Sequence, residues 1–282
     1  MKCAWKSYIN VLPHWMREQV DSLGRDRLQE LRLRIGRPPE LLCMDGSRYL
    51  DRFVSMDDLC YCVNAASQYS PWASATIANG YITAPGGHRL GICGDVAVID
   101  GKISTITNIS SLCIRVARDF PGVGLRASGL TGSTLIIGSP GRGKTTLLRD
   151  LIRQKSNSDS GAVAVVDERR ELFPFVDGQF AFYPGSRTEV LSGCSKGAGT
   201  EILIRTMNPK WIAVDEITAV EDCEALIHAG WCGVSLLATA HGNDLQDFLS
   251  RPVYKAFRQC TLFENVIIMK PDKSWVLERV NL

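Results

Sequence analysis

Short, wholly apolar runs alternate with stretches of helical periodicity in the second half of the chain. After Lys144, for example, leucine and isoleucine residues recur on one helical face. Strands that are apolar on both sides belong to parallel sheets covered by helices on both faces. The pattern predicts strand 134–138, helix 144–154, strand 162–166, helix 200–207, strand 211–214, helix 220–229 and strand 234–240. A final hairpin, which turns near residues 271–272, is expected at an antiparallel edge.

The first half of the chain has a different pattern of helical and strand segments. A helical pattern at 56–69 is followed by a meander of strands and glycine turns at 81–106. Residues 117–133 hold several glycines and a proline, which is typical of a linker. We therefore expect an N-terminal α+β domain at 1–116, a linker at 117–133 and an α/β domain at 134–282.

The composition is that of a globular protein, with 45% hydrophobic and 22% charged residues among 282. Lysine and arginine number 32 against 30 acidic residues, a formal net charge of +2. A chain so close to neutral has no overall positive electrostatic field that would attract phosphate backbones, so no nucleic-acid partner is expected. The N-terminal segment lacks the apolar core of a signal peptide, and polar residues or glycines interrupt the uncharged stretches at 59–88 and 225–243. Any membrane role is therefore expected to be peripheral.

The ten cysteines include no C-x-x-C pair, and most lie in apolar runs. A buried thiol behaves as a small hydrophobic side chain, whereas a disulfide scaffold or a zinc site needs closer pairing. We expect reduced, mostly buried cysteines and a cytoplasmic protein.

A phosphate-binding loop is the clearest chemical signal. The pattern G-x-x-x-x-G-K-[ST] is matched by Gly138, Ser139, Pro140, Gly141, Arg142, Gly143, Lys144 and Thr145, and Thr146 follows. Glycines let backbone N–H groups converge on phosphate oxygens, and the positive end of the next helix faces them. Lys144, expected to be partly exposed at the helix start, would neutralise the β- and γ-phosphates, and the Thr145 hydroxyl would ligate Mg²⁺. The expected cofactors are ATP and Mg²⁺.

Three other apolar strands also end in polar residues, namely Asp167-Glu168, Asp215-Glu216 and His241. Parallel strands bring such ends to one edge, where open α/β sheets bind ligands. Asp215 would support the metal, and Glu216 would orient and activate the attacking water. Taken alone, an acid pair after a strand is more often a helix cap, and a lone histidine is more often structural. Their position beside a phosphate loop favours the catalytic interpretation.

The block at 200–243 resembles the secretion ATPases that energise type II and type IV secretion and pilus machines. The order of their boxes is matched by the phosphate loop, VVDERREL, Asp215-Glu216 and ATAHGN. The resemblance implies a RecA-like P-loop ATPase domain, with Glu168 and His241 as catalytic residues that complete the pocket and sense the γ-phosphate. Unlike many secretion ATPases, the chain has no four-cysteine cluster, and it has Asp215 where they have a glycine.

Two N-terminal segments narrow the resemblance. QELRLRIGRPPELL and GYITAPGGHRLGICGDVAVIDGKISTITNISSLCIRVAR are similar to the stage III sporulation AA family of endospore formers. This resemblance implies a cytoplasmic ATPase, peripheral on the membrane, that forms a homo-oligomeric and typically hexameric ring. It also implies a role in powering a secretion-like channel between mother cell and forespore, whose integral membrane components are the expected partners.

In ring ATPases, an arginine from the neighbouring subunit often completes the γ-phosphate site. Arg115 and Arg118, just before the expected linker, are candidates for this role in trans. Arg32 and Arg34 form the basic face of a predicted strand. For both pairs the alternative is a solvated or internally paired face.

Other functions are compatible with the same motifs. A nucleic-acid motor would need basic grooves with aromatic residues, which the near-neutral charge does not favour. A P-loop kinase would transfer phosphate to an acceptor, and a nucleotide-gated scaffold would bind ATP with little hydrolysis. Phosphate release measured on the isolated protein separates these two from a motor.

Overall fold

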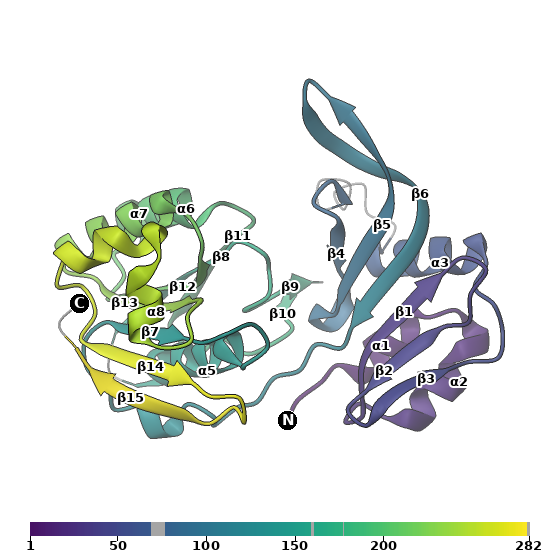
Figure 1. Cartoon of the computed structure of the whole chain (residues 1–282), viewed down its shortest axis with the longest axis horizontal. Coiled ribbons are helices and arrows are strands. Elements are labelled where there is room, and N and C mark those ends of the chain that lie inside the picture. Colours follow the sequence, from purple (N-terminus) through teal and green to yellow (C-terminus); the bar gives the residue numbers. More distant parts are fainter. Residues whose placement is uncertain (69–76, 159–160, 177, 281–282) are drawn as a thin grey trace. The chain divides into compact units, whose positions relative to one another are not determined.

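The computed structural model describes residues 1–68, 77–158, 161–176 and 178–280 (Figure 1). The chain forms two compact units, of which the first holds residues 1–119 with 174–181 and the second holds 120–173 with 182–282. Each unit has its own hydrophobic core. Most of the expected linker, 117–133, lies in the second unit, and a short hairpin from the second half of the chain joins the first unit.

The first unit is built on a six-stranded antiparallel sheet with the strand order β3-β2-β1-β6-β5-β4. In chain order its main elements are α1 (Trp5–Val11), α2 (His14–Leu23), β1 (Leu28–Arg34), β2 (Glu40–Cys43), β3 (Gly46–Tyr49), α3 (Met56–Ser67), β4 (Tyr81–Thr83), β5 (Arg89–Ile99), β6 (Lys102–Arg115), β9 (Phe175–Val176) and β10 (Gln179–Phe180). The helix predicted at 56–69 is thus α3, and Tyr69 lies outside the described residues. The basic face of β1 is internally paired, since Arg32 bonds Glu30 at 2.5 Å and Arg34 bonds Glu40 at 2.8 Å.

A fully buried histidine ties the N-terminal segment of this unit to its sheet. The backbone N–H of Ala117 donates to Nδ1 of His88 at 3.0 Å. Nε2 therefore carries the proton and donates to the carbonyl of Ala4 at 3.0 Å. Burial lowers the pKa of His88 from 6.5 to about 4, so the ring is neutral in the folded protein near pH 7.

Acidification is therefore expected to destabilise the first unit. The unfolded chain binds a proton at His88 more tightly than the folded chain, so stability falls as the pH drops from 6.5 through 4. Between pH 7 and pH 4 this group alone removes about 3 kcal/mol of unfolding free energy. Hydrogen exchange of the amides in β4, β5 and β6 measures the effect.

His88→Gln, which can keep both hydrogen bonds without titrating, should remove this part of the pH dependence. The matched control is His14→Gln, because His14 is exposed on α2. An unchanged pH slope in the His88→Gln variant would contradict the assignment.

The second unit is built on a seven-stranded sheet with the order β11-β8-β12-β13-β7-β14-β15. In chain order its elements are the 3₁₀ turn η3 (Leu125–Ala127), β7 (Thr134–Ile137), α5 (Lys144–Asn157), β8 (Val163–Asp167), β11 (Thr188–Ser192), α6 (Lys196–Met207), β12 (Trp211–Ile217), α7 (Val220–Trp231), β13 (Ser235–Ala240), α8 (Leu245–Ser250), the 3₁₀ helix η4 (Pro252–Gln259), β14 (Asn265–Met269) and β15 (Trp275–Arg279). All strand pairs are parallel except β14 with β15, which is the predicted C-terminal hairpin at the edge. Strands β7 and β8 are buried throughout, as their apolar sequences predict.

Helix α5 is buried on more sides than its leucine pattern indicates. Besides the leucines and Ile152, it buries five charged residues, Lys144, Arg149, Asp150, Arg153 and Lys155. Arg149 donates to the carbonyls of Glu171 and Leu172, each at 2.7 Å, and Arg153 donates to the carbonyl of Tyr183 at 2.9 Å. The charged side chains of α5 therefore hold the loops that surround it.

Two further expectations concern membrane-spanning helices and the burial of the cysteines. Within the described parts of the chain, no helix is long and apolar enough to cross a bilayer. The cysteines are free, but only Cys43, Cys62 and Cys223 are buried, whereas Cys60, Cys93 and Cys232 are exposed. The expectation that most cysteines are buried was therefore wrong, because residues such as Cys60 of α3 and Cys93 of β5 lie on the exposed faces of their elements.

Candidate nucleotide site

The phosphate loop connects the end of β7 to the start of α5. Gly141 and Gly143 adopt φ values of +75° and +95°, a left-handed conformation that favours glycine. A Cβ atom at Gly138 would lie 2.8 Å from Cβ of Met269, so the close packing of this loop also requires glycine there. The loop therefore brings backbone N–H groups and the N-terminus of a helix of 14 residues together, which is an anion-binding arrangement.

Lys144 is held against the loop that precedes it. Its ammonium group donates to the carbonyls of Gly138 at 2.7 Å and Ser139 at 3.1 Å, and lies 3.3 Å from Nδ1 of His241. The residue is only 8% exposed, so the expectation of partial exposure was wrong, because the loop and His241 cover the side chain. Burial lowers the pKa of Lys144, while the nearby charges of Asp215 and Glu216 oppose this shift.

Asp215 lies between two hydroxyl groups. Thr145 Oγ1 donates to one carboxylate oxygen at 2.7 Å, and Thr239 Oγ1 donates to the other at 2.5 Å. Hydroxyl and carboxylate oxygens are the hard ligands that Mg²⁺ prefers, and this ion commonly takes one or two protein ligands together with phosphate oxygens. The pair of Thr145 and Asp215 therefore fits a magnesium ion at the end of the phosphate loop.

A bulge in β12 turns two successive acidic residues toward the site. The pairing of β12 with β13 shifts in register between Val214 and Ile217. The backbone of Glu216 has a φ of +57°, which is unusual for a residue other than glycine. Its backbone N–H donates to Thr239 Oγ1 at 2.7 Å. Side chains of a regular strand alternate between faces, so the bulge is what lets Asp215 and Glu216 act together.

The Glu216 carboxylate bonds a histidine and an arginine. Its Oε1 lies 2.5 Å from Nε2 of His241, and its Oε2 accepts a hydrogen bond from Arg169 at 2.7 Å. Burial raises the pKa of Glu216, but the His241 hydrogen bond and the charges of Arg169 and Lys144 outweigh it, so the net pKa lies below its ordinary value. Nε2 of His241 then carries a proton, and Nδ1 is left to accept from Lys144.

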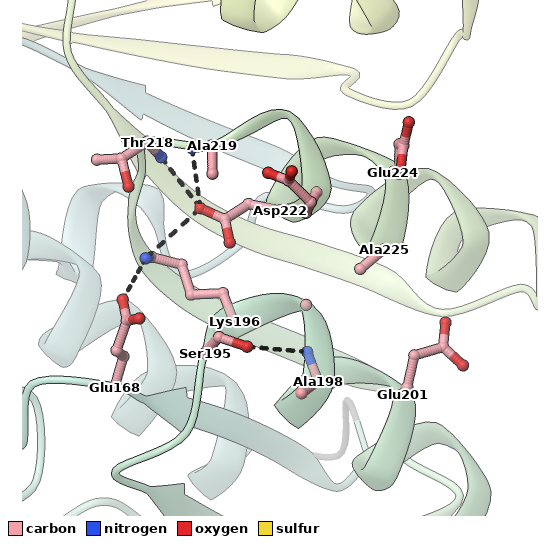
Figure 2. A pocket seen from close by; sticks show the side chains of 12 residues that line it. Glu168, Ser195, Lys196, Ala198, Glu201, Thr218, Ala219, Asp222, Glu224 and Ala225 are labelled. Carbon is pink, nitrogen blue, oxygen red and sulfur yellow. Dashed lines mark hydrogen bonds and ion pairs between the residues drawn. The ribbon is translucent and has the colours of Figure 1, made fainter. Parts of the chain in front are cut away.

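Glu168 lies at this edge of the sheet, but its carboxylate is bonded to Lys196 on α6. The Lys196 ammonium group lies 2.5 Å from Glu168 and 3.5 Å from Asp222 (Figure 2). Asp222 in turn accepts from the backbone N–H groups of Thr218 and Ala219. These residues line an acidic hollow of about 610 Å³ at the start of α6 and α7.

Glu168 also lines a cavity of about 20 Å³ together with Asp215 and Glu216, although it bonds neither of them. Its neighbour Asp167 is buried and accepts the backbone N–H groups of Glu171 and Phe173, both at 2.8 Å. Burial raises the pKa of Asp167 to about 6, and the charge of Asp215 adds to the shift. Asp167 thus anchors the turn after β8.

The two candidate trans arginines belong to the first unit. Arg115 lies 3.3 Å from Glu30, and its side chain is 64% exposed. Arg118 donates to the backbone carbonyls of Arg25 and Leu28, so its guanidinium group is occupied within its own unit. Of the pair, Arg115 has the side chain that is accessible to another molecule.

Sequence reasoning missed three side chains that hold the site together, namely Thr239, Arg169 and Asn243. Thr239 is fully buried and joins Asp215 to the backbone of Glu216. Its signal was a lone hydroxyl group near the end of an apolar strand, two residues before His241. Asn243 accepts a hydrogen bond from Ser139 of the phosphate loop at 2.8 Å.

The comparisons with known proteins agree with this architecture. The sequence model of the family described as "Sporulation stage III, protein AA" matches residues 8–276. The chain belongs to this family. It is 34% identical, over 278 residues, to the Stage III sporulation protein AA of Bacillus subtilis (strain 168), and the match covers 93% of this chain and 90% of that protein.

Solved structures with the same fold include an ATPase and a pilus retraction motor. The ATPase DotB of Legionella pneumophila superposes with a TM-score of 0.59 at 17% identity, covering 94% of this chain and 78% of that one. The pilus retraction motor PilT with bound ADP gives a TM-score of 0.62 at 14% identity, with coverage of 92% and 80%. The predicted α/β fold class, a RecA-like P-loop fold after a smaller α+β domain, is confirmed.

Proposed function

We propose that the chain is a Mg²⁺-dependent ATPase that energises the assembly of, or transport through, a secretion-like channel between mother cell and forespore. One observation carries the ATPase part of this proposal. Lys144, Thr145, Asp215, Glu216 and His241 come from three segments of the second unit and, through Thr239, form one connected set of short contacts beside the phosphate loop. Membership of the sporulation family supports the cellular role.

Different residues of the site would bind the phosphates, hold the metal ion and activate the attacking water. Backbone N–H groups of residues 138–145 and the ammonium group of Lys144 would bind the phosphates of ATP. Thr145 and Asp215 would hold Mg²⁺, which neutralises negative charge on the phosphates when it is bound. Glu216, ionised near pH 7, would orient the attacking water and accept its proton.

His241 links the lysine to the catalytic carboxylate. Because it contacts both Lys144 and Glu216, a phosphate that draws Lys144 away changes the surroundings of Glu216 through the same ring. This supports a role in sensing the γ-phosphate. For Glu168, the close ion pair with Lys196 supports a positioning role at the edge of the site rather than proton transfer.

The family resemblance also supports a homo-oligomeric ring, for which we propose a hexamer on the cytoplasmic side of the membrane, bound to integral membrane components of the channel. Arg115 is the proposed trans-acting arginine because its side chain is largely exposed. No nucleic-acid partner is proposed, since the net charge of +2 provides no general attraction for phosphate backbones.

Phosphate release from ATP by the purified full-length chain tests the catalytic proposal. We expect release in Mg²⁺ and its loss in excess chelator, because the donor set of Thr145 and Asp215 fits that ion. Asp215→Asn should lower the rate at limiting Mg²⁺ by about tenfold or more. The matched control is Asp272→Asn in the β14–β15 turn. Equal rates with and without Mg²⁺ would contradict the proposal.

A further inference from the structure

A hollow of about 300 Å³ opens beside the phosphate loop in the second unit. It shares Gly141, Arg142, Gly143 and Thr146 with the loop region, and this volume is within the range of ligand pockets. The remaining lining residues are apolar except for one lysine, namely Phe120, Val123, Leu147, Met269, Lys273 and Trp275. A ligand whose phosphates lie on the loop can therefore extend a flat, apolar group into this space.

One wall of the hollow comes from a segment with little regular structure. Phe120 and Val123 precede the short 3₁₀ turn η3, and Val123 is 43% exposed. Trp275 of β15, another lining residue, packs against Arg126, whose guanidinium carbon lies 5.1 Å from the centroid of the tryptophan ring. Aromatic and aliphatic faces of this kind suit a nucleoside base, because every base offers a flat π-face for stacking.

A buried carboxylate on α5 fixes this wall. Asp150 is fully buried, and its oxygens accept the backbone N–H groups of Gly122 at 3.0 Å and Gly124 at 2.8 Å. Arg153 donates to the same carboxylate at 2.7 Å. A buried charge is costly unless such partners satisfy it, so these bonds hold the segment in one position.

The fit between the segment and α5 is close. A Cβ atom at Gly124 would lie 3.1 Å from the carboxylate of Asp150 and 3.1 Å from the side chain of Leu151. Farther along, Lys155 of α5 donates to the carbonyl of Ser128 at 3.1 Å. The helix that begins at the phosphate-loop lysine therefore also holds the wall of the neighbouring hollow.

We propose that the hollow receives the base of the bound nucleoside triphosphate, and that Asp150 is the positioning residue that keeps its Phe120–Val123 wall in place. This inference rests on the proposed function, because it concerns the same nucleotide. It assigns to Asp150 no contact with the phosphates and no part in hydrolysis.

The test compares a ligand with a base and one without. Calorimetry of the full-length chain in Mg²⁺ measures the affinity for ATP and for inorganic tripolyphosphate. Asp150→Asn keeps the side-chain shape but replaces an acceptor by an N–H donor facing other donors. We expect ATP affinity to fall by about tenfold, and tripolyphosphate affinity to change by less than about twofold, since only the base contacts the altered wall.

A milder variant covers the case in which Asp150→Asn does not fold. Gly124→Ala leaves every charge in place, and should displace the segment from α5 by a few tenths of an ångström and weaken ATP selectively. The matched control is Gly129→Ala, because a Cβ atom there meets nothing within 4 Å. It should bind both ligands as the unaltered chain does.

Each outcome decides between the proposals. Selective loss of ATP affinity in Asp150→Asn or Gly124→Ala supports the inference. Equal losses for ATP and tripolyphosphate, or no loss in either variant, overturn the role of Asp150, while binding of both ligands by the unaltered chain still supports the proposed function. If the unaltered chain binds neither ligand, the proposed function fails, and this inference fails with it.

Discussion

Lys144→Ala is expected to abolish ATP binding, with an affinity loss of at least about a hundredfold, because several charge-assisted hydrogen bonds to phosphate disappear together. The ammonium group is already positioned at the loop by the carbonyls of Gly138 and Ser139. Since the residue is mostly buried, the alanine variant also loses packing, and some loss of thermal stability is expected. Calorimetry with ATP, alongside thermal unfolding, separates the two effects.

A second substitution at this position isolates the charge. Lys144→Met keeps most of the side-chain length and should restore stability without restoring ATP binding. Lys255→Ala, an exposed lysine on η4, is the matched control and should leave both properties unchanged. Near-normal ATP affinity in the folded Lys144→Met variant would remove the phosphate-loop assignment.

Glu216→Gln is expected to separate binding from hydrolysis. Glutamine keeps the size of the side chain and can still accept the hydrogen bond from His241, so ATP should bind with near-normal affinity. It cannot accept a proton from water, and the hydrolysis rate should fall by about a hundredfold or more, the scale of general-base loss. Single-turnover phosphate release with saturating ATP is the measurement.

Glu168→Gln is the matched control for this prediction. Glu168 lies at the same edge of the sheet but is neutralised by Lys196, so its substitution should reduce hydrolysis far less than that of Glu216. Comparable losses of hydrolysis rate in the Glu168→Gln and Glu216→Gln variants would indicate that Glu168 also takes part in the hydrolysis reaction. Unchanged hydrolysis in Glu216→Gln would exclude Glu216 as the general base.

Mixtures of variants then test the contribution of a neighbouring subunit. Glu216→Gln and Arg115→Ala subunits should each hydrolyse ATP slowly when alone. If Arg115 acts in trans, mixing them restores activity, because some interfaces combine an intact Glu216 with an intact Arg115. Activity that never exceeds the sum of the two separate variants argues against a trans role for Arg115.

The position of the candidate site at one edge of the sheet was predictable from the sequence because it follows from topology. Apolar strands predict a parallel sheet, and a parallel sheet brings the ends of its strands to one edge. The sequence alone therefore groups Lys144, Asp215, Glu216 and His241 at this edge. The strand patterns also predicted the antiparallel edge formed by β14 and β15.

What could not be predicted depends on local departures from regular geometry. A strand pattern assigns Asp215 and Glu216 to opposite faces, and only the bulge brings both into the site. The hydroxyl of Thr239 joins them, although its sequence signal was weak. Likewise, glycine content indicated a linker at 117–133, whereas the contacts of Asp150 with Gly122 and Gly124 attach that segment to the second unit.

Helix α5 has a consequence for how this chain can change over evolutionary time. Helix α7 exposes Glu221, Glu224, His228 and Trp231 at helical spacing, and such a stripe can accumulate neutral substitutions. Of the 14 residues of α5, by contrast, Asn157 alone is exposed. Almost every substitution in α5 therefore meets a loop, a strand or the nucleotide site, and the helix has no surface on which the sequence can drift freely.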